Sequence, residues 1–129
     1  MVTFKQLELK GRIRKKRKNK VPALKHNPQQ LGICAKVVIR APKKPHSGKK
    51  KLVKLRFKNK LRRQVFVYIP GIGHDLKQYD HILFRGGRRR DVPGLRYTLI
   101  RGKYDVKPLA FEVRKTSRSK YGIKKTLLK

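Results

Sequence analysis

Apolar and polar residues alternate along the middle of the chain with the period of a β-strand. In the segment 51–58 every second residue is apolar, namely Val53, Leu55 and Phe57, and the residues after each of them are basic. The segment 64–69 repeats the pattern with Val65, Val67 and Ile69. This alternation predicts two half-buried antiparallel strands with a basic outer face, joined as a hairpin by the residues around 59 and 60.

Three further segments carry strand signals. The first, 33–40, is rich in β-branched residues, and the second is the short run 82–85. In the third, 95–100, inward residues are expected to alternate with outward ones: Leu95, Tyr97 and Leu99 against Arg96 and Thr98. Five short strands favour a closed barrel, because closure removes the exposed edges of a flat sheet. We therefore predict an all-β fold, a small five-stranded closed barrel of OB-fold type over residues 33–105, with extended basic N- and C-terminal arms.

The N-terminal residues 1–32 lack strand alternation. Thr3 and Gln6 have the spacing of a capping box, which predicts one short helix that ends by Gly11. Residues 12–20 read RIRKKRKNK and show no periodicity. We expect them to form an extended arm that becomes ordered only against phosphate groups.

Positive charge extends over the whole chain. Thirty-nine Lys and Arg residues stand against six Asp and Glu residues, which gives a formal net charge of +33. The charge continues through the C-terminal extension 106–129, in which residues 109–113 are expected to form a short strand or to pack on the barrel. Since cations occur along the whole chain, we expect phosphate groups on nearly every side of the protein. A folded RNA presents phosphates in this way and is the favoured partner. A membrane surface is the competing polyanion, but the longest apolar run, 65–69, is far too short to span a bilayer.

Few residues have the arrangement that catalysis or metal binding requires. The single Cys34 excludes an intramolecular disulfide and fits a reducing compartment. Neither it nor the four histidines show paired metal-ligand spacing, so we predict no metal site and no cofactor, apart from Mg²⁺ bound through RNA. His74 and Asp75 are adjacent in sequence and face opposite ways on an extended chain, and no nucleophile motif surrounds them. We therefore predict no catalytic residue.

Two loops gather the candidate RNA-binding residues. In the loop 42–51, Pro42 and Pro45 cannot join a strand ladder, so they stiffen a loop that presents Lys43, Lys44, His46 and Ser47. In the loop 85–94, glycines allow close approach of the backbone, and three consecutive arginines can bind phosphates bidentately: Arg88, Arg89 and Arg90. Each loop alone could be a solvated basic turn, with Asp91 as a counter-ion in the second. The overall charge favours RNA contact.

Aromatic residues are few, with five Phe, five Tyr and no Trp. Phe57 and Tyr97 fall on predicted inward faces, which leaves Phe66 and Tyr68 as candidates for stacking on bases. We therefore expect the barrel to bind structured RNA through charge and shape more than single strands through stacking.

The two loops also carry a family resemblance. PKKPHSG at residues 42–48 and RGGRRRDVPGLRY at residues 85–97 closely resemble signature loops of the universal small-subunit ribosomal protein S12 family, of bacterial or organellar type. Further matches follow in the same order: VPAL at 21–24, PQQLGIC at 28–34, YIPGIGHDL at 68–76 and RSKYGIKK at 118–125. The resemblance covers nearly the whole chain, and the lysine-rich background is similar to that of organellar members.

This resemblance implies a non-catalytic structural constituent of the small ribosomal subunit, which binds rRNA at the decoding centre and helps to set translational accuracy at the aminoacyl site. It implies that Pro45 and Ser47 approach the codon–anticodon helix, where a hydroxyl can exchange hydrogen bonds with 2′-hydroxyl groups. Asp91 matches an aspartate that some bacterial members modify. The residues that match decoding-site loop positions are Lys43, Lys44, Pro45, His46, Ser47, Arg88, Arg90, Asp91 and Pro93.

The resemblance also implies that the N-terminal arm threads through rRNA. The residues expected to bind rRNA are Arg12, Arg14, Lys15, Lys16, Arg17, Lys18, Lys20, Lys49, Lys50, Lys51, Arg85, Arg89, Arg118, Lys120, Lys124 and Lys125. The implied partners are small-subunit rRNA, messenger RNA and transfer RNA at the aminoacyl site, other ribosomal proteins and, transiently, elongation factors, with one copy per ribosome and no membrane. We expect a location in the mitochondrial ribosome of the matrix, with a plastid ribosome or the bacterial cytoplasm as alternatives. A free RNA chaperone or regulatory RNA-binding OB protein is the alternative function.

The chain departs from the family pattern at several positions. His46 stands where the family usually has Asn, and Arg90 stands where Lys is usual. Tyr79 aligns with a histidine that is expected to contact an elongation factor, so this contact is not assigned to Tyr79. Short insertions are also expected in the turn 58–63 and before Arg118.

Overall fold

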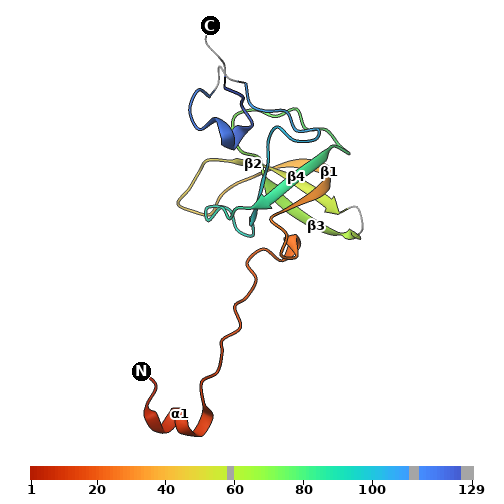
Figure 1. Ribbon diagram of the computed structural model, residues 1–129. Helices are drawn as coiled ribbons and strands as arrows, with labels where there is room; N and C mark the ends of the chain where they lie inside the picture. Colours follow the sequence, from red (N-terminus) through yellow and green to blue (C-terminus); the bar gives the residue numbers. More distant parts are fainter. Residues whose placement is uncertain (58–59, 111–113, 126–129) are drawn as a thin grey trace.

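A computed structural model describes the chain except residues 58–59, 111–113 and 126–129 (Figure 1). Its elements are α1 (Phe4–Lys10), the 3₁₀ turn η1 (Pro22–Leu24), β1 (Gln29–Arg40), β2 (Lys50–Phe57), β3 (Lys60–Tyr68), β4 (His81–Gly86), β5 (Tyr97–Leu99) and the 3₁₀ turn η2 (Arg118–Tyr121). The five strands close into a barrel in the order β1-β2-β3-β5-β4, and only the β3–β5 pair is parallel. The predicted all-β barrel is confirmed.

Strand β1 begins at Gln29 instead of the predicted Ile33. Its first half pairs with β4, from Gln29 opposite Arg85 to Ile33 opposite His81, and its second half pairs with β2. A register shift between Cys34 and Lys36 separates the two halves. One bent strand therefore belongs to both sides of the barrel, which is how the sheet closes.

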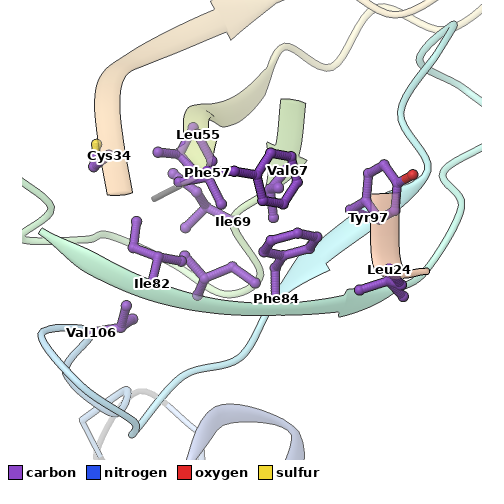
Figure 2. Close-up of a cluster of buried hydrophobic side chains, with 12 residues drawn as sticks. Leu24, Cys34, Leu55, Phe57, Val67, Ile69, Ile82, Phe84, Tyr97 and Val106 are labelled. Atoms are coloured by element: carbon purple, nitrogen blue, oxygen red, sulfur yellow. The ribbon is translucent and has the colours of Figure 1, made fainter. Parts of the chain in front are cut away.

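The barrel interior holds the main apolar cluster (Figure 2). Phe84 is fully buried between two other aromatic rings: its ring centroid lies 5.9 Å from that of Phe57 and 5.5 Å from that of Tyr97, both in edge-to-face orientation. The predicted inward residues of β2, Val53, Leu55 and Phe57, are all buried. Thr98, predicted to face outward, is also buried, and its hydroxyl donates to the carbonyl oxygen of Gly87 at 3.1 Å.

The N-terminal helix forms as predicted. The Gln6 amide donates to the Thr3 hydroxyl and the Thr3 amide donates to the Gln6 side chain, which completes the capping box. The helix ends at Lys10, and Gly11 caps it. No residue of α1 is buried, and residues 12–20 run away from the barrel without regular structure (Figure 1).

The turn η1 fixes the root of this arm to the barrel. Leu24 is buried in the main apolar cluster, and the Ala23 amide donates to the Tyr97 hydroxyl at 3.0 Å. This hydrogen bond joins the root of the arm to β5, the last strand of the barrel.

We expect Tyr97→Phe to lower the free energy of unfolding by about 1–3 kcal/mol, because the partly buried Ala23 amide loses its acceptor while the ring still fits. Urea unfolding measures the loss, and faster amide exchange at Ala23 locates it. Tyr104→Phe is the control, since that side chain is exposed. Equal stability of the Tyr97 variant and the parent would show that the hydrogen bond contributes little.

The C-terminal extension packs against the loop that follows β3, where a Cβ at Gly71 would lie 3.3 Å from both the Leu109 Cδ2 and the Tyr121 Cδ1. The Leu109 amide donates to the Tyr121 carbonyl oxygen at 3.0 Å, and Leu109 is buried. Gly122 lies so close to Arg101 that a Cβ there would come within 2.8 Å of the Arg101 carbonyl oxygen. Of the predicted segment 109–113, Leu109 thus packs on the fold, and 111–113 lie outside the described residues.

Candidate nucleic-acid interface

The two candidate loops lie side by side. The Lys43 amide donates to the Asp91 carbonyl oxygen at 2.8 Å, and the Lys50 Nζ lies 3.8 Å from the Asp91 Oδ2. Both loops leave the barrel on the same side (Figure 1). One residue of the second loop therefore holds the first through both its backbone and its side chain.

The first loop presents most of its predicted site residues to solvent. Its exposed members are Lys43, Lys44, Pro45, His46, Ser47 and Lys49. The His46 amide donates to the Lys43 carbonyl oxygen at 3.0 Å, and the Lys44–Pro45 peptide bond is cis. The predicted loop is too long at its C-terminal end, because Lys50 and Lys51 begin β2 and pair with Arg40 and Ile39.

The second loop is a hairpin extension whose apolar side chains anchor it to the barrel. The Gly87 amide donates to the Arg96 carbonyl oxygen and the Arg89 amide to that of Leu95, both at 3.0 Å. Val92 and Leu95 are buried against Leu52, in a cluster outside the barrel interior. Arg85 and Gly86 of the predicted loop belong to β4. The exposed site residues are Arg88, Arg89, Arg90 and Pro93.

Gly87 leaves no room for a side chain at the base of this hairpin. A Cβ there would lie 2.5 Å from the Thr98 Oγ1 and 3.1 Å from the Thr98 Cβ. The glycine thus brings the loop backbone directly against β5, in keeping with the close approach expected from the sequence.

The N-terminal arm begins beside the second loop. A groove of about 950 Å³ is lined on one side by Arg17, Lys18 and Lys20 and on the other by Arg88 and Arg96. No acidic residue lines it. The seven basic arm residues are all exposed: Arg12, Arg14, Lys15, Lys16, Arg17, Lys18 and Lys20.

The predicted C-terminal site residues lie elsewhere. Arg118 and Lys120 belong to η2, and Lys124 and Lys125 follow it. The C-terminal segment and the N-terminal arm leave from opposite sides of the barrel (Figure 1). The structure therefore brings the two loops and the root of the N-terminal arm together on one side of the barrel. The C-terminal cations do not lie on that side.

Three acidic residues lie around the segment that precedes β4, where Lys107 and two backbone amides contact them. Asp75 pairs with Lys107 at 3.3 Å, and Asp105 accepts from the His81 amide at 2.7 Å. Asp80 accepts from the Lys77 amide at 2.6 Å. A hollow of about 420 Å³ is lined by all three acids. This part of the surface differs in charge from the side that carries the loops.

His74 is held as a neutral acceptor. Burial, followed by the nearby Lys51 and Arg101, lowers the pKa of His74 although Asp75 opposes the shift. The His74 Nδ1 accepts from the Leu76 amide at 3.4 Å. This contact gives His74 a structural role.

Arg101 is a structural residue that sequence reasoning missed. It is buried, its Nε donates to the Pro70 carbonyl oxygen at 2.6 Å, and its Nη2 donates to the Gly73 carbonyl oxygen. Burial lowers the pKa of Arg101, while Asp75 and Tyr121 oppose the shift. Its position near the end of the segment predicted as the barrel does not reveal this role, since a buried arginine has no sequence signal that separates it from a solvated one.

Among the residues that the structure describes, no group of three His, Cys, Asp or Glu side chains could hold a metal ion. No helix among them is long and apolar enough to cross a bilayer.

A family model described as Ribosomal protein S12/S23 matches residues 17–126. The matched range includes the whole barrel, both loops and the end of the N-terminal arm, and it begins after α1.

Proposed function

The chain belongs to the ribosomal protein S12/S23 family and is a structural component of the small ribosomal subunit, and from this premise we propose that its two joined loops face the decoding centre and help to set translational accuracy at the aminoacyl site. Ribosomal RNA and other ribosomal proteins are its partners. The contact between messenger RNA, transfer RNA and the loops, and transient contact with elongation factors, belong to the proposal.

One observation carries this proposal. Asp91 holds the loop 42–49 against the second hairpin by accepting from the Lys43 amide, and its carboxylate pairs with Lys50 at the start of β2. Since the anchored hairpin packs Val92 and Leu95 on the barrel, the exposed Pro45 and Ser47 stand on a braced base. A side chain that distinguishes codon–anticodon helices must keep its own position when the helix changes. A loop that is held in place by its neighbours keeps its side chains in position in this way.

The cations around these loops would hold them to rRNA. Lys43, Lys44, Arg88 and Arg90 are exposed and can bind phosphate oxygens, and the hydroxyl of Ser47 can exchange hydrogen bonds with 2′-hydroxyl groups. We propose no catalytic residue and no cofactor beyond Mg²⁺ bound by the rRNA. Asp91 remains a candidate for modification, which an intact-mass measurement checks.

Measurement of translational accuracy tests the proposed decoding role. We expect Lys43→Arg or Arg90→Gln to change misreading by about 2- to 10-fold, equivalent to about 0.4–1.4 kcal/mol at the decoding step. Incorporation into small subunits should stay near the parental level, because both side chains are exposed and neither supports the barrel. A reporter for near-cognate decoding measures the effect, and Lys103→Arg, which is exposed in the turn that follows β5 and lies outside both loops, is the control. If both variants assemble and misread at the parental rate, the decoding role is wrong.

Whether the protein is bound to the small subunit or free in the cell distinguishes the ribosomal function from that of a free RNA chaperone or regulatory RNA-binding OB protein. Sedimentation of the native protein at high Mg²⁺ should show near-complete migration with the small subunit. A mostly free pool would favour the chaperone. We place the ribosome in the mitochondrial matrix, with the plastid and the bacterial cytoplasm as alternatives, and fractionation of the source cells distinguishes the three.

A further inference from the structure

Two arginines lie over aromatic rings on the outside of the barrel. The Arg40 Cζ lies 4.0 Å from the centroid of the Phe66 ring, and the Arg89 Cζ lies 4.3 Å from that of Tyr68. The rings are two residues apart on β3, so they share one face of the strand. Both rings are half-buried and both arginines are exposed.

Three separate elements build this arrangement. Arg40 ends β1, the rings belong to β3, and Arg89 comes from the loop 85–94. The rings pack against the outer apolar cluster of Leu52, Val92 and Leu95. The apolar cluster therefore fixes each ring, and each guanidinium lies over a fixed ring. The cation–π contact restricts the orientation of the guanidinium.

The surrounding face carries further cations. Lys54 stands opposite Phe66 in the β2–β3 register, and Lys36 stands opposite Lys54 in the β1–β2 register. We call the set Lys36, Arg40, Lys54, Phe66, Tyr68 and Arg89 the Arg–aromatic face. In the portion of the chain with described side chains, no carboxylate pairs with any of these four cations. Their mutual repulsion favours the binding of an external anion.

The stacked arginines also decide what kind of contact this face makes. Phe66 and Tyr68 are the candidates for stacking on bases, but a guanidinium group already lies over each ring. A guanidinium on a ring keeps its planar N–H edge available, and that edge matches the two oxygens of a phosphate. The face is therefore suited to a sugar–phosphate backbone, whose charges repeat at a spacing that several fixed cations can meet.

We propose that the Arg–aromatic face is a second RNA-binding surface, distinct from the tips of the two loops, and that Arg40 and Arg89 clamp phosphates of a folded rRNA segment there. The proposal rests on the ribosomal function, which supplies the RNA. An acidic protein surface is the competing occupant. The net charge of +33 and the exposed arginine-rich loop that continues into this face favour RNA.

Directed hydroxyl-radical probing tests what covers the face. Gln64 is exposed on the same side of β3 as Phe66, so Gln64→Cys places an iron chelate there without removing a charge. Cys34 is 1% exposed and burial raises its pKa to about 11, so the parental thiol stays unlabelled and the parent treated identically is the control. In reconstituted small subunits we expect rRNA cleavage from the Gln64 variant and none from the parent. Absence of rRNA cleavage would overturn the proposal and favour a protein neighbour.

Charge-preserving substitution tests the clamp. Arg40→Lys keeps the charge but loses the planar fork, so we expect about 3- to 10-fold weaker binding to small-subunit rRNA with an unchanged salt dependence. Arg114→Lys is the matched control, because the Arg114 Cζ lies 4.7 Å over the Tyr121 ring outside this face, and it should change binding less than about 2-fold. Equal losses in both variants would refute a specific site.

The two proposals can fail separately. If Gln64→Cys subunits assemble, the loop variants alter misreading and no rRNA is cleaved, only the Arg–aromatic face is wrong. If the protein does not enter small subunits, the ribosomal function fails as well.

Discussion

Phe84→Ala is expected to lower the free energy of unfolding by about 3–5 kcal/mol, which is a large part of the stability of a small domain. Phe84 is fully buried, and its ring contacts those of Phe57 and Tyr97 edge to face. Removing it leaves a cavity that β4 cannot close, because β4 is paired with both β1 and β5. Urea unfolding followed by circular dichroism measures the loss.

Phe4→Ala is the matched control for this prediction. It makes the same chemical change on α1, where the Phe4 side chain is 94% exposed, so the free energy of unfolding should change by less than about 0.5 kcal/mol. The difference between the two variants then reports burial alone. A Phe84 variant as stable as the Phe4 variant would contradict the position of Phe84 at the centre of the barrel.

Replacement of all seven arm cations by glutamine is expected to weaken binding to small-subunit rRNA by at least about 100-fold at physiological salt and to reduce the slope of log affinity against log salt by about 3 to 6. The cations are exposed along residues 12–20, which make no regular structure. Each phosphate contact releases counterions, so losing contacts flattens the salt dependence. Assembly of the small subunit should be impaired in parallel, while the barrel stays folded.

A chain with the residues of the arm in scrambled order controls for sequence-specific contacts. It keeps the charge and should retain the salt slope, because the electrostatic component depends on the number of cations near phosphate. Titrations over a range of salt concentrations measure both variants. A glutamine variant with the parental slope would show that the arm does not contact phosphates.

The local features of this protein could be predicted from sequence. The capping box of Thr3 and Gln6 and the alternation of Val53, Leu55 and Phe57 depend only on residues a few positions apart. The loop residues 43–47 could be identified because prolines and lysines mark an exposed turn, and the structure exposes them. Their decoding role remains a proposal.

Features that join distant residues could not be predicted in this way. Gln29 and Gln30 have no strand signal, yet they pair with Arg85 and Phe84 and extend β1. Thr98 looked outward by alternation, but the close approach of Gly87 covers it. In the sequence Arg101 resembles the many other basic residues of the chain, although it donates to two backbone carbonyl oxygens inside the fold.

By itself the sequence determined the strand-forming segments, the short helix, the basic arms and the excess of positive charge, because periodicity, capping and charge reside in neighbouring residues. Only the tertiary structure decided that β3 and β5 pair in parallel to close the barrel, that Asp91 joins the two loops, and that Arg40 and Arg89 lie on the rings of β3. These contacts connect residues far apart in the chain, and packing of the whole barrel selects them from many pairings that local preferences leave equally open.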